Sequence, residues 1–135
     1  MATTKARVVL GKRPATIRRT VTADLPEGGE GMIEVDYRYR TRKEYGDLLD
    51  ARMAAAQSAD GARAEAGDGP LTAGELQAVS VKATAEHILD IATGWGLPEP
   101  FDLEHVMQLC DELPGMATAI VDEYRMAIIE GRRGN

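Results

Sequence analysis

At 135 residues and 44% hydrophobic content, the chain is long enough for one domain with a buried core, and its composition is not that of a disordered protein. Its single cysteine, Cys110, excludes an internal disulfide framework, and its apolar runs are far shorter than the roughly 20 residues of a membrane-spanning helix. The net charge of −6 is uneven: residues 1–43 carry 10 Lys and Arg against 5 Asp and Glu, and residues 44–135 carry 6 against 17. The two regions could therefore attract each other, within one molecule or between copies.

Two stretches of the N-terminal third alternate with the period of a β-strand. "ATIRRTVTA" (15–23) and "MIEVDYRYR" (32–40) are rich in β-branched and aromatic residues. "LPEGGEG" (25–31) lies between them and has the composition of a turn. We therefore expect an antiparallel hairpin, with "ARVVL" (6–10) as a candidate third strand.

The period changes to that of a helix at Thr41. "TRKE" (41–44) matches a capping box, in which the Thr41 side chain caps the Glu44 amide, and the apolar spacing then predicts a helix over residues 42–57. The small and polar residues 58–70 follow, which indicates a flexible connection.

Three more helices are expected after this connection. A second capping box, Thr72 with Glu75, opens a helix that ends near Thr93. Asp102 is a suitable N-cap for the next helix. Pro114 is suited to the first turn of the last helix, which continues to about residue 130.

This order of elements predicts an α+β fold. An N-terminal antiparallel β-hairpin or small sheet is followed by a helix and then by a C-terminal helical bundle. We divide the chain into residues 1–57 with the hairpin and first helix, a flexible linker over 58–71, and a helical part over 72–135. We expect these parts to form one compact domain overall.

The sequence contains no constellation typical of an enzyme or of a cofactor site. His87 and His105 fall on different expected helices, and the spacing of His105 and Cys110 is poor for one helix face. No CxxC or HxxxH motif suggests a metal site, and the glycines of residues 28–31 lack the Lys-Ser/Thr of a phosphate loop. We therefore predict a protein without catalytic residues, metal or cofactor, with Cys110 as a small core residue.

A basic cluster at the junction of strand and helix is the strongest candidate binding site. It consists of Arg38, Arg40, Arg42 and Lys43. Cations are not favoured at a helix N-terminus, so the cluster suggests an acidic partner outside the helix. Mixed cations and tyrosines can also bind single-stranded nucleic acid, but these tyrosines alternate with the arginines and should pack inward. We therefore favour an acidic protein partner, a second copy included, over nucleic acid.

Three apolar residues are further candidate contacts. Trp95 stands between two glycines at a helix end and is either a core residue or a binding anchor. Met107 and Met126 fall near the apolar faces of the later helices, where methionine either fills the core or lines an adaptable groove. Met126 lies off the apolar stripe of its helix, so we expect it to be the more exposed of the two.

Three segments carry a resemblance to a known family. They are "DYRYRTRKEY" (36–45), "DIATGWGLPEPFDLEHVMQLCDELPGM" (90–116) and "AIVDEYRMAIIEGRRGN" (119–135). In order and spacing the chain resembles the phage tail assembly chaperones of long-tailed phages and prophages. The resemblance implies a non-enzymatic protein that binds the tape measure protein and helps recruit tail tube subunits. It also implies action in the host cytoplasm, in keeping with the lack of a signal peptide after Met1, and absence from the finished virion.

Two alternative functions stay open at this point. The first is a minor structural tail component that remains in the virion. The second is a small nucleic-acid-binding protein that uses the basic hairpin, which would bind more weakly as salt rises.

Overall fold

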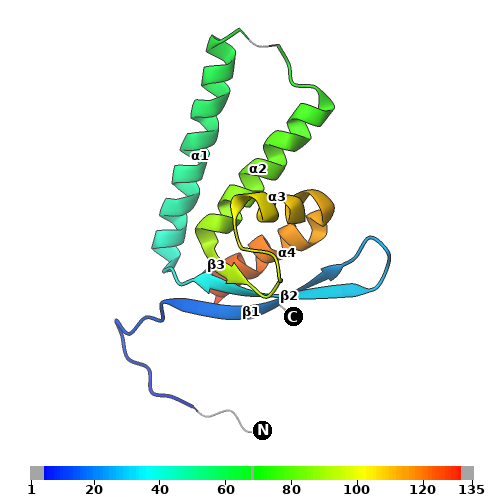
Figure 1. The fold of residues 1–135 in the computed structure, drawn as a ribbon. Helices are drawn as coiled ribbons and strands as arrows, with labels where there is room; N and C mark the ends of the chain where they lie inside the picture. Colours follow the sequence, from blue (N-terminus) through cyan, green and yellow to red (C-terminus); the bar gives the residue numbers. More distant parts are fainter. Residues whose placement is uncertain (1–4, 68, 132–135) are drawn as a thin grey trace.

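The structure is a computed structural model that describes residues 5–67 and 69–131. Its class is α+β, as the sequence predicts: a three-stranded antiparallel sheet with helices on one side (Figure 1). The elements in chain order are β1 (Thr16–Asp24), β2 (Glu30–Arg38), α1 (Arg42–Glu65), α2 (Ala73–Ile91), β3 (Ala92–Trp95), α3 (Leu103–Glu112), α4 (Pro114–Arg125) and a π-helical turn, η1 (Met126–Glu130).

The predicted hairpin is confirmed as β1 and β2. Arg18 lies opposite Asp36 in the register, and the guanidinium donates two hydrogen bonds to this carboxylate, of 2.7 and 3.0 Å, on the exposed face. The turn contains Gly28 and Gly29 at φ of +101° and +77°, a backbone region in which a side chain is strained. The other face of the hairpin enters the core.

The third strand of the sheet is β3, not the "ARVVL" segment (6–10), so that expectation was wrong. β3 pairs antiparallel with β2, and Trp95 lies opposite Val35. A short strand fits here because Gly96 follows it: the Gly96 amide donates to the Glu34 carbonyl at 2.8 Å, and a side chain at Gly96 would stand only 3.2 Å from the Cβ of Glu34. This close approach depends on a contact between segments about sixty residues apart, which the sequence pattern does not reveal.

The first helix extends further than predicted. Both capping boxes are confirmed, at Thr41 and at Thr72, but α1 continues past the expected end at Gln57 to Glu65. The added segment is rich in Ala, Arg and Glu, whose helix propensity outweighs the cost of about 1 kcal/mol for Gly61. The connection between α1 and α2 is therefore shorter than expected, while the division of the chain at residues 58–71 stays a prediction.

The core lies between the sheet and the helices, with α4 packed against β1 and β2. The Tyr37 hydroxyl donates to the Ile120 carbonyl at 2.7 Å, and burial raises the pKa of Tyr37 far above its usual range. The Tyr124 ring contacts both Tyr37 and Tyr45, at centroid distances of 5.2 and 5.4 Å. The fully buried aliphatic side chains around them are Val21, Val35, Ile88, Ile91, Val106 and Ile120.

One ion pair also joins the sheet to α4 on the core side. Arg19 lies on the inward face of β1, and its Nε is 3.8 Å from a carboxylate oxygen of Glu123, which is buried. A buried carboxylate is stable only beside a cation or hydrogen-bond donors, so this pair fixes how α4 sits on the sheet.

None of the helices in the described part of the chain is long and apolar enough to cross a membrane.

Candidate partner-binding surfaces

The basic cluster predicted from the sequence surrounds the end of β2 and the first turn of α1, but its members differ in role. Arg40 is partly buried: its guanidinium donates to the Tyr124 hydroxyl at 3.1 Å, and this hydroxyl donates to the Arg38 carbonyl at 2.9 Å. Arg38, Arg42 and Lys43 have exposed side chains. Arg40 therefore ties the strand–helix junction to α4, whereas the other three cations face solvent.

Arg13 also belongs to this surface, although no pattern in the sequence marks it as part of the cluster. Its guanidinium pairs with the Glu44 carboxylate and lies 5.2 Å from the centre of the Tyr39 ring. The Thr41 amide, and after it Arg13, lowers the pKa of Glu44 below its usual value. Arg13, Tyr39 and Glu44 line an open hollow of about 500 Å³, together with Arg38 and neighbouring residues. Lys43 of the basic cluster also pairs with Asp47, at 3.3 Å, so this surface is partly neutralised by its own acidic neighbours.

The aromatic rings of this region do not form a platform for bases. Tyr37 and Tyr45 are buried, as predicted, whereas Tyr39, which was also expected to pack inward, is only partly buried and its ring lies against Arg13. Base stacking on single strands needs exposed rings beside the cations. The arrangement therefore favours a protein partner over nucleic acid for this surface.

Trp95 is half-buried between β3 and the loop that follows it. Its indole N–H donates to the Glu99 carbonyl at 2.8 Å, and its ring meets Phe101 edge-to-face at 5.2 Å. Trp95 also lines a groove of about 220 Å³ with Leu97, Leu109 and neighbouring residues. The side chain thus has a structural role and one face that a partner could contact.

The candidate methionines have intermediate exposure. Met107 lies between α3 and α2, and Met126 opens η1 beside Val21 in a hollow of about 250 Å³. The expectation that Met126 is the more exposed of the two stays a prediction, because both side chains are partly buried; Met126 lies beside β1, in a hollow that Thr20 and Thr22 also line. Among the methionines that the structure describes, the strongly exposed ones are Met32, at 71%, and Met53, at 64%.

An uncovered apolar surface belongs to α1 and the first half of α2. Tyr45 is the one buried residue of α1, and beyond it the helix extends away from the sheet beside α2 (Figure 1). Leu49 and Met53 of α1 are exposed by 42% and 64%, and Leu76 and Val79 of α2 by 55% and 44%. We call this region the α1–α2 surface.

A groove runs between these two helices. Arg52 joins them, with one guanidinium nitrogen 2.9 Å from the Asp90 carboxylate and another donating to the Ala83 carbonyl at 3.0 Å. Further along, the helices leave a groove of about 380 Å³ whose apolar lining consists of small side chains: Ala55, Ala56, Ala59, Val79 and Ala83.

The second half of the molecule is strongly acidic. Residues 83–124 contain nine Asp and Glu and no Lys or Arg. On α3, Glu104 and Asp111 are exposed, and neither forms an ion pair with any residue in the described ranges. They stand on the rim of a groove of about 520 Å³ between α2 and α3.

The groups that sequence reasoning considered for catalysis or metal binding lie apart. Cys110 is buried, and burial raises the pKa of its thiol to about 11. His105 instead pairs with Asp102 at the N-terminus of α3, with Nδ1 2.7 Å from the carboxylate, and His87 is partly buried in α2. Among residues 5–67 and 69–131, no three His, Cys, Asp or Glu side chains gather as metal ligands would.

Comparison with known proteins gives the family. A family model described as phage tail assembly chaperone matches residues 1–135, the whole chain. The chain therefore belongs to the phage tail assembly chaperone family, as its motifs suggested. No curated protein and no solved structure matches it.

Proposed function

We propose that this chain binds the tape measure protein during tail assembly and helps recruit tail tube subunits to it. It does so in the host cytoplasm, without catalysis, and is absent from the finished virion. The α1–α2 surface carries the proposal, because a chaperone for a long helical client needs apolar surface that its own fold leaves uncovered.

The dimensions of this surface suit a helical client. A helix of 24 residues, the length of α1, spans roughly 36 Å. The alanines of the groove let another backbone approach closely, and the exposed Leu49, Met53, Leu76 and Val79 offer apolar contacts beside them. An amphipathic helix of the tape measure protein would bind here by its apolar stripe.

The exposed cations supply a second set of contacts in this proposal. Arg38, Arg42 and Lys43 lie beside the first turn of α1 and would face acidic residues of a tail protein. Trp95 and Met126 lie elsewhere on the molecule, where they would contact a second partner such as a tail tube subunit.

Co-expression with the tape measure protein tests the proposal. The tagged chain serves as bait, and the soluble fraction of the tape measure protein is measured with and without it. Met53→Asp, alone and with Val79→Asp, should reduce the co-purified tape measure protein strongly. The matched control is Met32→Asp, which places the same charge on an exposed methionine of the sheet.

Two outcomes would contradict the proposal. One is a tape measure protein that stays insoluble while the chain elutes alone. The other is recovery of the chain from purified virions in stoichiometric amount, which would instead support a minor structural tail component. If Met32→Asp and Met53→Asp reduce binding equally, the α1–α2 surface is not the site.

A further inference from the structure

The first residues of the described chain form an uncovered arm. Residues 5–13, here called the N-terminal arm, contain no helix or strand and are exposed throughout. Val8 and Leu10 are exposed by 89% and 94%, more than any other large apolar side chains in the described ranges. Arg13 fixes the base of the arm to Glu44 and Tyr39.

The arm combines these apolar side chains with cations. Lys5 and Arg7 precede the apolar residues 8–10, and Lys12 follows them. Within the described part of the chain, none of these three cations forms an ion pair. The arm therefore has the chemistry of a short basic and apolar ligand without a receptor.

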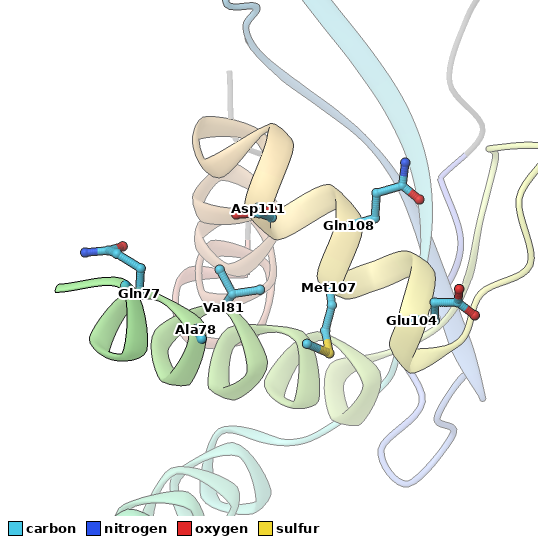
Figure 2. A pocket seen from close by; sticks show the side chains of 8 residues that line it. Gln77, Ala78, Val81, Glu104, Met107, Gln108 and Asp111 are labelled. Atoms are coloured by element: carbon cyan, nitrogen blue, oxygen red, sulfur yellow. The ribbon is translucent and has the colours of Figure 1, made fainter. Parts of the chain in front are cut away.

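The groove between α2 and α3 has the complementary chemistry. Met107 and Val81 lie between the two helices, whereas Glu104 extends to the side (Figure 2). Glu104 and Asp111 border this apolar floor, within the segment 83–124 that has no Lys or Arg at all. An open groove of about 520 Å³ with an apolar floor and an unpaired acidic rim fits an apolar segment flanked by cations.

We infer that the N-terminal arm of one copy binds the α2–α3 groove of a second copy. The arm leaves the sheet on the side away from α2 and α3, so it points away from the groove of its own molecule (Figure 1). The contact joins two different surfaces, arm to groove, so the first copy keeps a free groove and the second copy keeps a free arm. Repetition would then build a ring or an open chain of copies.

This inference does not depend on binding to the tape measure protein, and its test uses the purified full chain alone. Sedimentation velocity is recorded over a range of protein concentrations, at about 0.05 M and about 0.5 M salt, which changes the reach of charge interactions severalfold. We expect association that grows with concentration and weakens at the higher salt. Leu10→Asp should weaken it about tenfold or more, because burying one leucine side chain is worth roughly that factor. Met32→Asp on β2 is the control, a charge placed on an exposed apolar side chain away from the groove, and it should leave the association unchanged.

Charge exchange gives the sharpest result. Lys5→Glu with Arg7→Glu should abolish association, and so should Glu104→Lys with Asp111→Lys. Mixing these two variants should restore it, since the reversed arm then meets the reversed groove. Circular dichroism checks that each variant is folded, and the restoration shows that a loss was not due to misfolding.

Three outcomes would overturn the inference. The first is a chain that stays monomeric at every concentration and at both salt levels. The second is association that Leu10→Asp leaves unchanged. The third is failure of the two charge-reversed variants to associate when mixed, although both are folded.

Discussion

Removing the Tyr124 hydroxyl tests how the strand–helix junction is held. This hydroxyl accepts a hydrogen bond from Arg40 and donates one to the Arg38 carbonyl, at 3.1 and 2.9 Å, and Tyr124 is fully buried. A buried hydrogen bond contributes about 1 kcal/mol, and more when one partner is charged. Because Arg40 keeps some contact with solvent and can be hydrated, we expect Tyr124→Phe to lower the free energy of unfolding by about 1–2 kcal/mol.

Thermal and urea unfolding followed by circular dichroism measure this change. For a domain of this size we expect a fall in Tm of about 4–8 °C. Arg40→Ala should cost a similar amount, and the double variant should cost less than the sum, since both changes remove the same bond. The matched control is Arg42→Ala, an exposed cation of the same cluster, which should stay within about 0.5 kcal/mol of the wild type.

Unchanged stability in Tyr124→Phe and Arg40→Ala, or effects of the two changes that simply add, would refute this role of Arg40. Arg40 would then be a free cation like Arg42, and the whole basic cluster would be available to a partner. The expected result instead assigns Arg40 to the fold and leaves Arg38, Arg42 and Lys43 as the candidate contacts.

Three further predictions concern single residues. Gly61→Ala should raise the helicity measured by circular dichroism and stabilise α1 by up to about 1 kcal/mol, because a Cβ at this position meets no atom within 4 Å. A loss of helicity would instead show that α1 ends before Gly61. In an NMR titration, His105 should titrate above its ordinary pKa, because Asp102 stabilises the imidazolium, and His87 below it, because burial disfavours the charge. The contribution of His105 to stability is therefore present at acid pH and is lost as pH rises through its raised pKa. Protonation of His87, in contrast, destabilises the fold as pH falls. Asp102→Asn should return the pKa of His105 towards its ordinary value. Cys110, with its pKa near 11 and its buried thiol, should react with a thiol reagent only on unfolding, and rapid reaction of the native protein would contradict this.

Features fixed by neighbouring residues could be predicted from the sequence. The hairpin follows from alternation and a glycine-rich turn, and the caps at Thr41, Thr72 and Asp102 each depend on a residue three positions away. Pro114 likewise opens α4 as expected. These signals are local, so one sequence contains them in full.

Features fixed by contacts between distant residues could not be predicted from the sequence. β3 exists because "ATGW" meets β2, and the extent of α1 reflects a balance of propensities around Gly61. The bond of Arg40 to Tyr124 joins residues 84 positions apart, so the sequence showed a uniform basic cluster where the structure separates one arginine from the rest. The exposure of Met53 also depends on the extension of α1 away from the sheet, which no local pattern predicts.

Hydrogen exchange on the complex with the tape measure protein tests the central claim most directly. Amide exchange is compared between the free chain and the co-purified complex. The account predicts slower exchange in α1 beyond Met53 and in the first half of α2, with little change in β1. Protection confined to the basic cluster or to α3, or failure to form any complex, would contradict it.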